Sequence, residues 1–99
     1  MFKEELFGPV FSLYRVKDDN EAIEYANNSD YGLGAAIFTK DLERAERVAN
    51  QLDAGMIYIN DFVQSQHDVP SGGCKESGYG RECFIDGLID LSNSKSVVY

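Results

Sequence analysis

The chain has 99 residues, enough for one small domain or for a piece of a larger one. It is 43% hydrophobic, so it can bury a modest core, and 17 acidic against 9 basic side chains give a formal net charge of −8. This acidity repels nucleic-acid phosphates and anionic membranes, which argues against both as partners.

Cysteine usage and the lack of long apolar runs predict the cellular location. Cys74 and Cys83 are too few for a disulfide framework and lack the spacing of a metal site, which favours a reducing compartment. No stretch approaches the length of a membrane span, and the start, "MFKEELFGP", has the pattern of neither a signal peptide nor a basic transit segment. We therefore expect a cytoplasmic protein with no membrane span and no metal site.

The first half of the chain alternates between strand and helix patterns. Apolar and β-branched residues over 9–16 predict a strand. Asp18 and Glu21 form an acidic capping box at the start of a helix that ends within 27–32. The continuous apolar run 33–39 predicts a strand covered on both faces.

A second helix is predicted from about Asp41, because apolar residues recur at helical spacing over 42–52. Gly55 stands where a left-handed cap belongs, and residues 56–60 predict a third buried strand. This order indicates an α/β fold: a β-α-β-α-β unit with a mainly parallel sheet.

The last part of the chain has weaker patterns. Residues 61–82 lack periodicity, and an irregular segment of that length usually carries function or packs on a partner. A short apolar helix is predicted within 84–91, and "SKSVVY", residues 94–99, predicts a terminal strand. Its unpaired amides leave two alternatives, an antiparallel edge strand on its own sheet or a strand that joins another chain.

The glycine-rich segment "PSGGCKESGYGRE", residues 70–82, has three interpretations. As a phosphate cradle it is weak, because residues 78–80 supply only half of G-x-G-x-x-G and residues 73–75 lack the Walker spacing. Cys74 as a nucleophile would need a base, and the sequence does not require the single histidine, His67, to reach it. A small side chain in a turn is the favoured interpretation. One histidine also argues against a zinc or iron site.

Several segments, in order, resemble the NAD(P)-dependent aldehyde dehydrogenases. "EELFGPV", residues 4–10, is similar to the family segment E-E-x-F-G-P-V. The glycine-rich segment is similar to P-F-G-G-x-K-x-S-G-x-G-R-E, and residues 26–60 are similar to A-N-x-x-x-Y-G-L-x-A-x-V-F-T … A-G-x-V-x-x-N. Order and spacing hold from Glu4 to Val98, which corresponds to about the last fifth of a family subunit.

The resemblance implies a fold role and an activity. Residues 1–93 would be the C-terminal part of an aldehyde dehydrogenase catalytic domain, and residues 94–99 a strand that pairs with another chain in a homo-oligomer. The complete enzyme would oxidise an aldehyde to a carboxylate with NAD or NADP. We do not expect this chain alone to bind the cofactor tightly.

The resemblance assigns two residues to the cofactor. Glu5 matches the glutamate that hydrogen-bonds the ribose hydroxyls next to the nicotinamide, and a carboxylate can accept from two vicinal hydroxyls at once. Phe7 matches the aromatic residue that packs beside the nicotinamide. Both roles position the cofactor and make no bond to substrate.

No catalytic residue is assigned in this chain. In the family, the nucleophilic cysteine lies in a G-Q-x-C segment upstream of this region, as do the oxyanion asparagine, the activating glutamate and the Rossmann-type domain. Cys74 does not match the nucleophile. The resemblance implies that Gly72 and Gly73 let the loop pass close to the active-site wall and that Gly78 and Gly80 shape the start of the last helix.

The resemblance also places a substrate wall. Residues 61–69 line the substrate tunnel in the family, so Gln64 and Ser65 are expected in the wall. Ser71 replaces a common phenylalanine, which predicts a roomier, more polar wall and a polar or small aldehyde. Two other functions stay open: a stand-alone, non-catalytic chain that self-associates, and an independent nucleotide-binding module.

Overall fold

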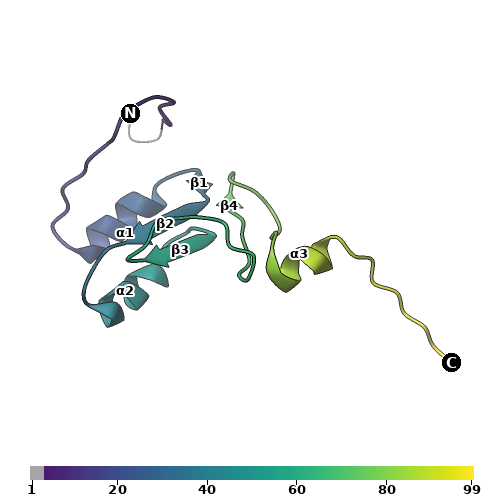
Figure 1. Cartoon of the computed structure of the whole chain (residues 1–99). Coiled ribbons are helices and arrows are strands. Elements are labelled where there is room, and N and C mark those ends of the chain that lie inside the picture. Colours follow the sequence, from purple (N-terminus) through teal and green to yellow (C-terminus); the bar gives the residue numbers. More distant parts are fainter. Residues whose placement is uncertain (1–3) are drawn as a thin grey trace.

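The computed structural model describes residues 4–99, which form three helices and two small sheets. In chain order the elements are α1 (Asp19–Asn27), β1 (Tyr31–Gly32), β2 (Gly34–Ile37), α2 (Leu42–Ala49), β3 (Met56–Ile59), β4 (Cys74–Lys75) and α3 (Phe84–Asp90). β2 and β3, which α2 connects, pair in parallel, whereas β1 and β4 pair antiparallel (Figure 1). The chain is a mixed α/β structure, and the predicted parallel strand pair is confirmed.

Helices α1 and α2 begin at the aspartates that the sequence predicts. The Asp18 carboxylate accepts from the Glu21 backbone N–H at 2.9 Å, and the Glu21 carboxylate accepts from the Lys17 N–H at 2.7 Å. Asp41 caps α2 by accepting from the Arg44 N–H at 2.9 Å. Both predicted starts are confirmed, because side-chain oxygens satisfy amides that have no partner within the helix.

A small apolar core lies where α1, α2 and β2 meet. The three elements line one hollow with short apolar side chains, which include Ala22, Ala26, Ala35, Ile37, Ala45 and Val48. Among residues 4–99, Ala45 is the only apolar residue that is fully buried. An ion pair between Arg44 and Asp19 joins the helices, and the hydrogen bond from Arg44 holds the pKa of Asp19 below its ordinary value.

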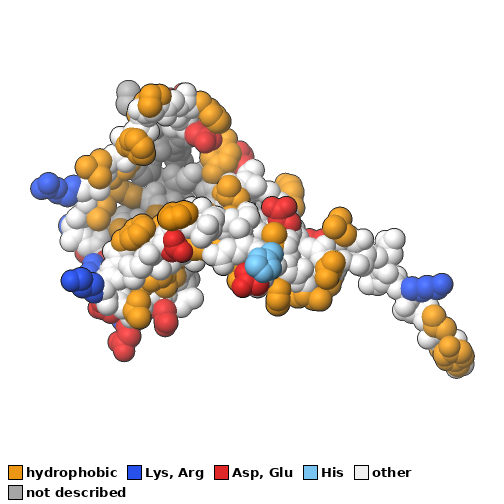
Figure 2. All heavy atoms as spheres, viewed as in Figure 1, with side chains coloured by type: hydrophobic (Ala, Val, Ile, Leu, Met, Phe, Trp, Pro, Cys, Tyr) orange, Lys and Arg blue, Asp and Glu red, His pale blue; other side chains and the backbone are white. Residues whose placement is uncertain are grey.

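The chain exposes more surface than a compact protein of its size. Its accessible surface is 8320 Å², whereas a folded monomer of 11.1 kDa exposes roughly 5,700 Å². Its radius of gyration is 16.8 Å, against about 13 Å for a compact domain of this length. Figure 2 shows apolar side chains on this surface, including the region of α3 and the C-terminal tip. Within residues 4–99, no helix is long and apolar enough to cross a bilayer.

Two predicted strands do not form in this chain. Residues 9–16 and 94–99 have no strand structure, and both segments run outside the body of the protein (Figure 1). A strand needs a neighbour to pair its amides, and neither segment has one in the described part of the chain. Phe11 and Leu13 are accordingly 98% and 96% exposed. The prediction of a strand at 9–16 is wrong here, whereas pairing of 94–99 with another chain stays a prediction.

The apolar run 33–39 is less covered than predicted. Residues of β2 alternate between exposed and half-buried, so the prediction of a strand covered on both faces is wrong within this chain. A parallel strand is buried on both faces only where other elements cover both sides of its sheet. The irregular segment 61–82 is confirmed apart from β4, and the predicted C-terminal helix is confirmed as α3.

Gly55 does not cap α2. The helix ends at Ala49 with Asn50 as its cap, and Gly55 lies just before β3. A Cβ at Gly55 would lie 2.0 Å from the carbonyl oxygen of Gly72. Glycine is therefore required because two backbones approach closely, not because the chain makes a left-handed turn.

This contact makes Gly55 sensitive to the smallest side chain. We expect Gly55→Ala to lower the free energy of unfolding by about 3 kcal/mol or more, because the clash is with backbone that cannot rotate away. Gly8→Ala is the matched control, since a Cβ at Gly8 would meet nothing within 4 Å. Urea denaturation followed by circular dichroism measures both variants, and similar losses in the two would contradict the close approach.

Candidate functional site

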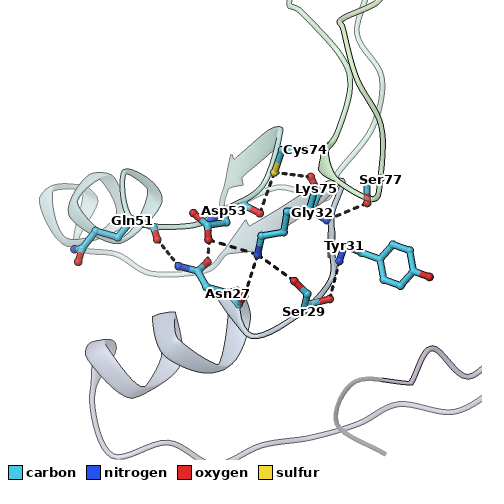
Figure 3. Close-up of polar contacts among 9 residues, drawn as sticks. All are labelled: Asn27, Ser29, Tyr31, Gly32, Gln51, Asp53, Cys74, Lys75 and Ser77. Atoms are coloured by element: carbon cyan, nitrogen blue, oxygen red, sulfur yellow. Dashed lines mark hydrogen bonds and ion pairs between the residues drawn. The ribbon is translucent and has the colours of Figure 1, made fainter.

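The side chain of Lys75 anchors the glycine-rich segment. Its amino group donates to the backbone carbonyls of Asn27 at 2.8 Å and Ser29 at 3.1 Å, and lies 3.4 Å from the Asp53 carboxylate. Figure 3 shows it pointing into the turn after α1. Carbonyls at the C-terminal end of a helix lack partners within the helix and attract positive charge. Lys75 therefore fastens the glycine-rich segment to the end of α1.

Further polar contacts close the same junction (Figure 3). The Asn27 side chain donates to the Gln51 carbonyl at 2.7 Å and accepts from the Asp53 N–H at 2.8 Å. The Ser77 hydroxyl accepts from the Gly32 N–H at 2.9 Å. Together with the Lys75 contacts, these bonds join the end of α1, the chain before β3 and the glycine-rich segment. We call this set the Lys75 network.

Cys74 has a structural contact of its own. Its thiol donates to the backbone carbonyls of Gly32 at 3.4 Å and Asp53 at 3.3 Å. His67, the base that a Cys74 nucleophile would need, contacts Phe84, because its backbone carbonyl accepts from the Phe84 N–H at 3.2 Å. The sulfur is therefore engaged by main-chain oxygens, which favours the turn interpretation of this segment over a cysteine nucleophile.

Glu4 and Glu5 line a groove beside the Lys75 network. The groove has a volume of about 670 Å³, and its other walls come from within residues 26–35, 52–54 and 76–77. Within residues 4–99, the Glu5 carboxylate makes no hydrogen bond or ion pair. The Phe7 side chain is 93% exposed. Both expected cofactor residues thus lie on open surface.

The three expected wall residues lie at different depths. Gln64 and Ser65 are exposed, and the Tyr58 hydroxyl of β3 donates to the Gln64 backbone carbonyl. Ser71 is only 2% exposed. Its hydroxyl lies 3.2 Å from Ser65 Oγ and donates to Met56 Sδ at 3.3 Å. The structure therefore brings Ser65 and Ser71 together, but only Ser65 and Gln64 reach the surface.

Sequence reasoning did not identify Lys75 as an anchor or Met56 as a partner of Ser71. The lysine is part of the G-G-x-K-x-S-G pattern, but Asn27, whose carbonyl it binds, lies 48 positions away. A local pattern carries no information on such a partner. The lysine within the glycine-rich segment was the only signal, and it did not indicate the role of the residue.

Comparison with known proteins decides the family. The model of the aldehyde dehydrogenase family matches residues 1–97. The chain belongs to the aldehyde dehydrogenase family. It is 52% identical over 96 residues to a succinate-semialdehyde dehydrogenase (NADP(+)) of Deinococcus radiodurans, an alignment that covers 97% of this chain and 20% of that relative.

The fold of this chain is similar to a part of solved aldehyde dehydrogenases. A betaine aldehyde dehydrogenase from Staphylococcus aureus, in complex with NAD+, superposes with a TM-score of 0.84 at 46% identity over 89% of this chain and 17% of its own. A succinic semialdehyde dehydrogenase from Streptococcus pyogenes, with NADP+, gives 0.83 at 46% identity over 88% and 19%. The chain spans about a fifth of the length of the curated aldehyde dehydrogenases it matches.

The anchoring role of Lys75 can be measured directly. Lys75→Met keeps the aliphatic stem but leaves the Asn27 and Ser29 carbonyls without their donor, so we expect the free energy of unfolding to fall by about 1–3 kcal/mol. Lys95→Met removes the same charge from the exposed C-terminal segment and should change it by less than about 0.5 kcal/mol. Urea denaturation compares the two. Equal effects would show that only the charge matters, and not the contacts.

Proposed function

We propose that this chain is part of an NAD(P)-dependent aldehyde dehydrogenase that oxidises an aldehyde to a carboxylate. Its contribution is to position the cofactor and to form part of the substrate wall. The family match over residues 1–97 carries this proposal. It is supported by the open position of Glu5 and Phe7, the two side chains that match the cofactor motif.

The chemistry of these two side chains fits a nicotinamide nucleotide. A carboxylate with no partner in residues 4–99 can accept from both hydroxyls of a ribose, and such charge-assisted bonds are strong. The exposed ring of Phe7 offers a flat apolar face to a second aromatic ring. The bound cofactor supplies the hydride acceptor. Glu5 and Phe7 hold and orient it.

Gln64 and Ser65 are proposed to face the aldehyde. Both are exposed on the loop after β3, and β3 supports this loop through Tyr58 and Met56. An amide and a hydroxyl favour a polar or small aldehyde. Relatives are named for succinate semialdehyde and betaine aldehyde, which both carry a charged group, and these are the first substrates to test. The two free cysteines support a cytoplasmic location.

The role of Glu5 is tested in the complete subunit that contains this segment. The wild type should reduce NAD+ or NADP+ when a polar aldehyde is added. We expect Glu5→Gln to raise the KM for the cofactor roughly tenfold, because the amide cannot accept from two hydroxyls with a full charge. The KM for the aldehyde should stay near the wild-type value. Glu4→Gln is the matched control, and an equal effect there would contradict a specific role for Glu5.

The 99-residue chain alone should show no aldehyde oxidation. Turnover by this chain that disappears in Cys74→Ala would overturn that expectation and restore the cysteine-nucleophile interpretation. Saturable binding of NADH or ATP by the chain alone would instead support an independent nucleotide-binding module.

We also propose that residues 94–99 pair with another chain in a homo-oligomer. The segment runs away from the body (Figure 1), and its apolar residues Val97 and Val98 are exposed. Unpaired β-branched residues favour addition to the edge of another sheet. The large exposed surface of the chain also favours self-association if it occurs alone.

Removal of this segment should lower the oligomeric state. We expect deletion of residues 94–99 to shift the protein to smaller species, as measured by light scattering after size-exclusion chromatography. A variant with both Ser94→Ala and Ser96→Ala keeps the full length and should not shift. An unchanged mass after the deletion would rule out strand exchange through this segment.

A further inference from the structure

We propose that Ser71 is a positioning residue for the substrate wall, because its buried hydroxyl sets the hydrogen-bonding direction of the exposed Ser65 hydroxyl. This proposal rests on the proposed function, since it concerns the wall that faces the aldehyde. It changes the expected role of Ser71, which the sequence predicts to line the wall itself.

Ser71 and Ser65 differ in how far their side chains are buried. Ser71 is 2% exposed although the chain as a whole is unusually open. Any further polypeptide that packs on this surface can only cover it more. Ser65 is exposed, and its Oγ lies 3.2 Å from Ser71 Oγ. Ser71 therefore acts on a ligand through Ser65.

The backbone of Ser71 is held by two hydrogen bonds to Glu82. Its backbone N–H donates to the Glu82 carbonyl at 2.8 Å, and its carbonyl accepts from the Glu82 N–H at 2.7 Å. Its hydroxyl donates to the sulfur of Met56, a residue of β3. The backbone position of Ser71 is therefore fixed, and its hydroxyl oxygen is held beside Ser65. Ser65 is exposed, so its side chain is less closely packed than that of Ser71.

The single hydroxyl hydrogen of Ser71 has two acceptors. Met56 Sδ lies at 3.3 Å and Ser65 Oγ at 3.2 Å, where either serine can donate. Oxygen is the stronger acceptor, but 3.2 Å is long for a bond between hydroxyls. Both arrangements are therefore available to the Ser71 hydroxyl, and bonds of this length in an active site often shorten when a ligand is bound.

The two arrangements present opposite groups to a ligand. If Ser71 donates to Met56, Ser65 donates to Ser71 and turns its lone pairs outward. If Ser71 donates to Ser65, the hydrogen of Ser65 is free to donate to the ligand. A carboxylate on the aldehyde needs that donor, whereas an alkyl chain does not. Ser71 thereby influences which aldehydes the wall accepts.

The experiment measures KM and kcat of the complete subunit with succinate semialdehyde and with butanal. We expect Ser71→Ala to raise the KM for succinate semialdehyde roughly three- to tenfold with kcat unchanged, because Ser65 loses the neighbour that orients its hydroxyl toward the ligand. The KM for butanal should not change. Ser65→Ala should raise the KM for succinate semialdehyde at least as much. Ser12→Ala, at an exposed serine in the N-terminal segment, is the control.

A double mutant separates positioning from direct contact. If Ser71 acts through Ser65, Ser65→Ala combined with Ser71→Ala should be no worse than Ser65→Ala alone. Additive effects would overturn the proposal, because Ser71 would then act independently. An equal rise in KM for both aldehydes would also overturn it, since that result indicates general damage to the wall. An unchanged KM for succinate semialdehyde in Ser71→Ala would overturn the proposal as well.

Met56→Leu tests the proposal if Ser71→Ala folds poorly, and a crystal structure of Ser71→Ala tests it if the enzyme is inactive. Met56→Leu conserves volume but removes the sulfur acceptor, so the KM for succinate semialdehyde should fall by about twofold or more while that for butanal stays constant. No change for either aldehyde would overturn the proposal. In a crystal structure of Ser71→Ala, the Ser65 side chain should change or divide its rotamer, and one unchanged rotamer would overturn the proposal. Absence of all aldehyde oxidation by the wild type would refute the proposed function, and the rotamer would still test Ser71.

Discussion

The ammonium group of Lys75 holds together parts of the chain that are far apart in sequence. It supplies hydrogen bonds to two carbonyls at the end of α1 and faces the carboxylate of Asp53, so one side chain joins α1, the chain before β3 and the glycine-rich segment. The same junction borders the groove that Glu4 and Glu5 line. Because β4 carries Lys75, this anchor also fixes the chain that leads from Ser71.

Around this junction many backbone groups are hydrogen-bonded, but the chain as a whole exposes a large surface. The Asp18 and Asp41 caps, the strand pairs and the Lys75 network supply backbone hydrogen bonds, yet the accessible surface of 8320 Å² far exceeds that of a compact monomer. Glu5 and Phe7 lie on this open surface, and the segments 9–16 and 94–99 lack strand partners in the described part of the chain. These features are consistent with the proposal that this chain is part of an aldehyde dehydrogenase, and the chain spans about a fifth of the length of the relatives it matches.

In the proposed substrate wall after β3, an exposed and a buried hydroxyl have different roles. Ser65 is exposed, whereas Ser71 is buried, contacts Glu82 and Met56, and lies within hydrogen-bond distance of Ser65. On this proposal, a substitution at the buried Ser71 alters substrate preference through Ser65, without direct contact between Ser71 and the substrate.

The sequence by itself determined the features that depend on near neighbours. Asp18 and Asp41 mark helix starts because each bonds an amide three positions away, and apolar spacing predicted the β2–α2–β3 unit. Motif order also identified the family, which the match over residues 1–97 confirmed. Only the tertiary structure decided that 9–16 forms no strand, that Gly55 serves a close backbone contact and that Ser71 lies behind Ser65. Each of these depends on a partner brought in by the fold, and alternation or spacing along the chain does not specify which residue that partner is.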